Sequence, residues 1–191
     1  MHWHHYEDTE LDDAKLGISR GSQHIEIAPM HLGSVSELNG ELASGIVKGY
    51  LAMAAKTKKR VRIALERLNQ AMRRMQPGDK AMELSIALET LLADGGSENT
   101  YKIGLRSALV IGGSNERRLR VRAIIGGAYV MRSKIVHSGE VSRETKVQGI
   151  GSMDSVNLAN EAAEVCAEVI RKIIHLGHIP HWFSLEVNVD R

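Results

Sequence analysis

The 191-residue chain is organised around one segment, Tyr129-Val130-Met131-Arg132-Ser133-Lys134-Ile135-Val136-His137-Ser138-Gly139. This segment ends a helical pattern that begins near Glu116, and its glycine is a common helix terminator. Arg132 falls in the middle of an apolar arc of that helix. Because burying an unpaired guanidinium is very costly, Arg132 needs a dedicated partner, or the arc meets a polar cleft or a second subunit. The arc consists of Val121, Ile124, Ile125, Ala128, Met131, Ile135 and Val136.

His137 lies five residues beyond Arg132. On an ideal helix the two side chains are therefore about 140° apart and do not stack as i, i+4 neighbours do. They could converge where the helix loosens before Gly139, or where two copies of the helix pack side by side. A satisfied structural Arg–His pair is the alternative interpretation of the same two residues.

Four segments follow one another along the chain: Arg62–Asn69, Ala87–Leu92, Tyr101–Arg106 and Arg132–His137. The last resembles the R-x4–6-H signature of HEPN domains, including the small polar residue after the arginine. The first three resemble, in the expected order, segments of the Apea-like HEPN branch. The resemblance covers roughly residues 57 to 177 and implies a HEPN-type bundle of four to five helices.

The spacing of apolar residues independently predicts an all-α protein, an antiparallel helical bundle. A weaker helical pattern over residues 41–56 contains two glycines and precedes the bundle. Gly126-Gly127 interrupts the longest pattern and either breaks that helix or lets another backbone come close. Residues 140–154 read as a polar loop. The bundle helices are predicted over residues 57–75, 79–92, 101–111, 116–138 and 156–176.

The two ends of the chain differ from its middle, which suggests three parts. Residues 1–56 are predicted to form an acidic, partly ordered leader with one short strand at His24–Pro29. Residues 57–178 form the HEPN helical domain. Residues 179–191 form a C-terminal extension, in which Trp182–Val189 alternates like a strand that could pair with Ile25–Ile27.

Composition limits the cellular setting. Charged residues make up 25% and hydrophobic residues 43% of the chain, which is typical of a globular protein. Cys166 is the only cysteine, so no internal disulfide is possible, and it is expected in the core. No apolar run is long enough to span a bilayer, and the first residues do not form a secretory signal. We therefore expect a cytoplasmic protein without a membrane partner.

Basic residues concentrate in the middle of the chain. In the block from residue 102 to residue 134, Glu116 is the only acid. Clustered arginines suit phosphate because the guanidinium fork makes bidentate contacts. The alternative is that these side chains merely solvate one helix face. The predicted RNA contacts are Arg106, Arg117, Arg118, Arg122 and Lys134.

No cofactor or metal site is predicted. His175, His178 and His181 lie close in sequence, but glycine and proline between them aim them poorly, and no carboxylate or cysteine completes the set. A phosphate-cradling glycine loop followed by Lys-Ser or Lys-Thr is also missing, which argues against nucleotide hydrolysis.

The HEPN resemblance implies metal-independent RNA cleavage that yields a 2′,3′-cyclic phosphate. It assigns His137 as general acid or base, Arg132 as the group that holds the scissile phosphate, and Ser133 as a residue that orients one of them. Ser133 departs from the family, which more often has Asn, Asp or His there. HEPN domains typically pair so that two motifs line one cleft, which implies a homodimer.

These expectations define an endoribonuclease of a prokaryotic defence or toxin-type system, with RNA as its substrate. Two other interpretations stay open. The chain could be a non-catalytic HEPN module that binds RNA or a protein partner. It could also be a dimerisation or sensor domain that acts with an antitoxin or another defence-system protein.

Overall fold

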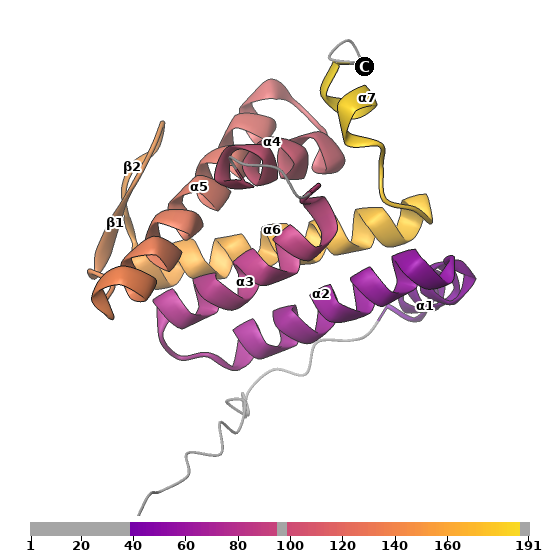
Figure 1. The fold of residues 1–191 in the computed structure, drawn as a ribbon, viewed down its shortest axis with the longest axis horizontal. Helices are drawn as coiled ribbons and strands as arrows, with labels where there is room; N and C mark the ends of the chain where they lie inside the picture. The colour runs from indigo at the N-terminus through magenta and orange to yellow at the C-terminus, as the bar shows by residue number, and fades with distance from the viewer. Residues whose placement is uncertain (1–38, 95–98, 188–191) are drawn as a thin grey trace, which may run out of the picture.

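The computed structural model describes residues 39–94 and 99–187. This part of the chain is mostly helical and contains one antiparallel β-hairpin (Figure 1). The all-α prediction is therefore confirmed at the level of fold class. The elements are α1 (Gly40–Ala52), α2 (Ala55–Arg73), α3 (Pro77–Leu92), α4 (Asn99–Ile111), α5 (Asn115–Ser138), β1 (Glu144–Val147), β2 (Gly151–Asp154), α6 (Ser155–Leu176) and α7 (Trp182–Val187).

Local signals in the sequence explain where the long helices begin and end. Ser114 caps α5, where its hydroxyl accepts a hydrogen bond from the Arg117 amide, and Asp154 caps α6. Gly139 and Gly177 end these two helices in the left-handed conformation, with φ of 74° and 75°. All five predicted bundle helices are present, with ends close to the expected residues.

The core lies where α3 and α6 meet the other helices. Figure 1 shows α2, α3 and α6 side by side, and α3 and α6 also contact α4 and α5. Fully buried aliphatic side chains such as Leu88, Ile124 and Ile170 fill the space between them, and Cys166 is buried as predicted. Among the helices that the structure describes, none combines the length and the apolar character needed to cross a membrane.

The N-terminal part of the chain is only partly described. Residues 40–52 of the predicted leader form α1, which packs on α6. The predicted strand at His24–Pro29, and with it the predicted pairing to the C-terminus, lies outside the described residues.

The C-terminal extension corrects one prediction. Trp182–Val187 is helical as α7 and is not a strand. Trp182 is buried, and the Arg106 side chain of α4 holds α7 through both Glu186 and the Trp182 ring. Apolar residues at positions 182, 183, 185 and 187 fit a short helix as well as a strand, so contacts with α4 determine the outcome.

The predicted loop over residues 140–154 contains the β-hairpin. β1 pairs with β2 from Glu144 opposite Asp154 to Val147 opposite Gly151. The hairpin packs against α5 at Gly127, where an added Cβ would lie 2.9 Å from Val147 Cγ2. The helix runs without a break through Gly126-Gly127. Of the two expectations for these glycines, a helix break and a close approach by another segment, the second describes this position.

Candidate nucleic-acid interface

Arg132 has a dedicated partner on the neighbouring helix α3. Its Nη1 lies 3.3 Å from Glu89 Oε1, and its guanidinium carbon lies 5.5 Å from the centre of the Tyr129 ring. The Tyr129 hydroxyl donates a hydrogen bond of 3.0 Å to the same Glu89 oxygen. The Arg132 side chain remains 37% exposed, so its charge is accessible to solvent and to a ligand.

Tyr129 stabilises this arrangement as a neutral hydrogen-bond donor. Burial, and then the Glu89 carboxylate, raise the pKa of Tyr129 well above its usual range. The phenol therefore stays protonated at any physiological pH and keeps Glu89 in place beside Arg132.

His137 and Ser133 are placed differently. Both are exposed near the C-terminal end of α5, and His137 lies in the last turn before Gly139. In the part of the chain that the structure describes, His137 forms neither a hydrogen bond nor an ion pair, and it does not pair with Arg132. A structural Arg–His pair within one chain is therefore not formed.

Two faces of α5 account for this separation. On an ideal helix of about 100° per residue, Arg122, Gly126, Ser133 and His137 fall within about 60° of one another. They form what we call the outer face of α5. Arg132 lies about 140° from His137 and points towards α3 instead. Much of the apolar arc is buried against α3 and α6 of the same chain, with Val136 as an exception at 58% exposure.

Arg106 corrects the predicted set of RNA contacts. Its residue surface is only 1% exposed. Its Nε lies 2.7 Å from Glu186 Oε1, its Nη2 lies 2.6 Å from Asp94 Oδ2, and its Nη1 donates to the Leu92 carbonyl. This arginine stabilises the junction of α3, α4 and α7 and is not available to a phosphate.

Two arginines of α5 are paired with acids of α6. Arg117 Nη2 lies 2.6 Å from Glu168 Oε1. Arg120 makes a bidentate contact with Glu161, at 2.7 Å and 3.0 Å. The basic block thus contains one acid, Glu116, along the sequence but has further acids beside it in space.

The remaining predicted contacts have no carboxylate partner among the described residues. Arg118 is half-buried, and its Nε makes no hydrogen bond. Lys134 is half-buried, with Nζ 3.5 Å from Ser142 Oγ. Arg122 is exposed and stacks on the Tyr101 ring, its guanidinium carbon 4.7 Å from the ring centre.

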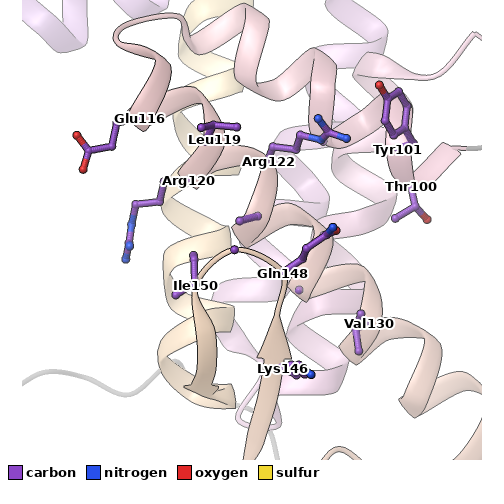
Figure 2. Close-up of a pocket in the computed structure, with 15 residues that line it drawn as sticks. Thr100, Tyr101, Glu116, Leu119, Arg120, Arg122, Val130, Lys146, Gln148 and Ile150 are labelled. Carbon is purple, nitrogen blue, oxygen red and sulfur yellow. The ribbon is translucent and has the colours of Figure 1, made fainter.

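The N-terminal part of the outer face of α5, at Arg122 and Gly126, belongs to one wall of an open groove with a volume of about 890 Å³. Ser133 and His137 lie beyond the groove lining. The first turn of α4 and the turn of the β-hairpin complete the groove. Figure 2 shows Arg122 extending towards Tyr101, whereas Glu116 and Arg120 point to the other side. Lys146 and Gln148 of the hairpin region also line the groove. Neither residue was predicted from the sequence to contact a ligand.

Metal-ligating residues are dispersed in the described ranges, 39–94 and 99–187, where no three His, Cys, Asp or Glu side chains form a cluster. His178 Nδ1 lies 2.9 Å from the Leu176 carbonyl, and His181 Nδ1 lies 3.0 Å from Ser184 Oγ. Each of these two ring nitrogens therefore has a local hydrogen-bond partner.

Comparison with known proteins gave no match, whether with family models, with curated proteins or with solved structures. The HEPN resemblance therefore stays a prediction that rests on the four segments of the sequence.

Proposed function

We propose that this chain is a metal-independent endoribonuclease of the HEPN type, acting in the cytoplasm as part of a prokaryotic defence or toxin-type system. The observation that carries the proposal is the exposure of His137 and Ser133 on the outer face of α5, in line with Arg122. Arg122 has no acidic partner in the described part of the chain. A general acid–base group and a free cation thus share one solvent-accessible face.

The proposed chemistry needs only groups that a protein side chain supplies. Neutral His137 accepts the proton of the ribose 2′-hydroxyl as O2′ attacks phosphorus. The bond from phosphorus to O5′ breaks, and the leaving oxygen takes up a proton from a second acid or from water. The products are a 2′,3′-cyclic phosphate and a 5′-hydroxyl.

Arg132 is proposed to stabilise charge on the phosphate oxygens, with Ser133 orienting the reacting groups. Within one chain Arg132 faces Glu89, about 140° around α5 from His137. We therefore propose a homodimer in which the α5 ends of two copies line one cleft. Light scattering at tens of micromolar protein is expected to give the dimer mass, and a monomer would exclude the composite site.

The test uses two histidines in equivalent positions. His137 and His175 are both exposed and both lie in the last turn of a helix that ends at a left-handed glycine. His137→Ala is expected to lower RNA cleavage by a factor of about 10²–10⁴. His175→Ala is expected to cleave like the wild type, and a chelator is expected to have no effect. Equal cleavage by both variants, or its loss with chelator, would exclude the mechanism.

One observation favours a second candidate, a non-catalytic HEPN module that binds RNA or a protein partner such as an antitoxin. The Glu89 carboxylate already neutralises Arg132, so phosphate must compete with it. This candidate predicts that the wild type binds RNA or the partner but releases no cyclic-phosphate product.

A further inference from the structure

The groove on the outer face of α5 has a mixed character. One part of its lining is cationic, from Arg122 and Lys146, and another is apolar, from Leu119 and Ile150. Leu119 is 65% exposed and Ile150 38% exposed. An anionic ligand that also carries flat apolar groups matches such a lining better than a simple ion does.

The two cations are available to a ligand. Neither Arg122 nor Lys146 has a carboxylate within ion-pair distance in the ranges that the structure describes. The Arg122 guanidinium lies over the Tyr101 ring, and its N–H groups form no hydrogen bond with the described residues, so they are open to phosphate oxygens. Of the other charged residues in the lining, Arg120 is paired with Glu161, and Glu116 points away from Arg122 (Figure 2).

Glycines open this wall of the groove. Gly126 lines it, and an added Cβ there would have no other heavy atom within 4 Å. Gly104 lies opposite Arg122, at 3.4 Å from an added Cβ to Arg122 Cγ. A ligand can therefore approach the helix backbone at Gly126 more closely than it could if a residue with a side chain stood there.

The groove is aligned with the proposed catalytic end of α5. Gly126 and His137 differ by about 20° around the helix and by about 16 Å along its axis. Ser133 lies between them on the same face. A strand that occupies the groove and continues along this face reaches His137 a few nucleotides later.

We propose that this groove is the binding site for single-stranded RNA on the side of the substrate away from the scissile phosphate. Arg122 and Lys146 contact two phosphates, while Leu119, Ile150 and the glycine wall accommodate bases and riboses. This inference rests on the RNA-binding part of the proposed function and adds to it the place where the strand lies.

The test separates binding from cleavage. A labelled 2′-O-methyl RNA oligonucleotide binds without being cleaved, because it lacks the attacking hydroxyl. Gly126→Leu fills the groove from the helix, and its affinity for this probe is expected to fall at least tenfold. Gly45→Leu is the matched control, since Gly45 is also a helical glycine with nothing within 4 Å of an added Cβ, but it lies in α1 and is exposed, whereas Gly126 is half-buried.

A charge variant tests the phosphate contacts. Each phosphate contact contributes about 0.7 to the slope of log affinity against log salt for a single strand. Arg122→Gln with Lys146→Gln is therefore expected to flatten the slope by about 1.4. Two paired arginines of α2, away from the groove, provide the control: Arg62→Gln with Arg67→Gln removes the same charge and is expected to change the slope much less.

Three results would overturn the assignment of the groove to RNA. The first is equal affinity of Gly126→Leu and wild type for the probe. The other two are displacement of the probe by a polyglutamate peptide of equal charge, or by a free mononucleotide at a concentration similar to that of unlabelled RNA. Binding in the groove without any cleavage would instead remove only the catalytic part of the proposed function. Cleavage that survives unchanged in Gly126→Leu would remove only the groove.

Discussion

Glu89 of α3 and Arg132 of α5 form the contact that fixes the motif arginine, with 3.3 Å between Oε1 and Nη1. The Tyr129 hydroxyl binds the same carboxylate oxygen. The arginine is thus oriented by its own chain before any ligand arrives, and a phosphate that binds it has to replace a carboxylate.

Replacing Glu89 with glutamine is expected to raise RNA affinity by up to about fivefold. The reason is that a partly exposed ion pair contributes at most about 1 kcal/mol, and this competition is removed. Glutamine keeps an oxygen acceptor for Tyr129. Fluorescence anisotropy with 2′-O-methyl RNA measures the change. Glu66→Gln on α2 removes an equal charge from the exposed Arg62 pair and is the control. Equal effects of both variants would mean that Arg132 does not contact phosphate.

The adjacent glycines of α5 are expected to respond in opposite directions to alanine. Gly126→Ala should stabilise the protein by about 0.5–1 kcal/mol, because alanine is the better helix former and the added Cβ meets nothing within 4 Å. Gly127→Ala should destabilise it by about 1–3 kcal/mol, because the Cβ would lie 2.9 Å from Val147 Cγ2 and 3.0 Å from Leu158 Cδ2. Urea unfolding measures both. A shared sign would contradict the close packing of the hairpin on α5.

Arg106 is expected to matter for stability and not for RNA. Arg106→Met should lower the free energy of unfolding by about 2–4 kcal/mol, because it leaves Glu186, Asp94 and the Leu92 carbonyl without this donor. It should also release α7, which limited proteolysis between residues 177 and 187 would detect. Arg122→Met, on the surface, should change stability by no more than about 0.5 kcal/mol. Wild-type stability of Arg106→Met would contradict the structural role.

Cys166 is expected to make the folded state sensitive to alkaline pH. Burial raises the pKa of its thiol to about 12 from an ordinary value of 9.0. Below pH 9 the thiol is neutral in both the folded and the unfolded state. Above pH 9 the unfolded chain loses the proton and the folded chain keeps it, so stability falls as pH rises from about 9 to 12.

Comparison with Cys166→Ala isolates this contribution. The difference in unfolding free energy between wild type and variant should shrink by up to about 1.4 kcal/mol per pH unit in that range. Urea unfolding at several pH values from 8 to 11 measures it. A constant difference would show that the thiol is not protected in the folded state.

The five bundle helices, α2 to α6, follow from the sequence alone, whereas the short α7 does not. Apolar periodicity, the caps Ser114 and Asp154 and the terminators Gly139 and Gly177 all act within one or two turns, so their effect can be read locally. The position of His137 on the outer face of α5 follows in the same way. The HEPN prediction itself rests on four such local segments.

The partners of the charged residues are determined only by the tertiary structure. Arg117 and Arg120 form ion pairs with acids of α6. Arg132 pairs with Glu89 on α3, and Arg106 pairs with Glu186 on α7. Helix packing brings these groups within a few ångströms although 40 to 80 residues separate them in sequence. The number of unpaired basic residues was therefore overestimated from the sequence, because an ion pair depends on distance in space and not on separation along the chain. The groove also depends on the tertiary structure, because its walls come from α4, α5 and the hairpin. The hairpin packs on α5 at Gly127, where a side chain would prevent the contact.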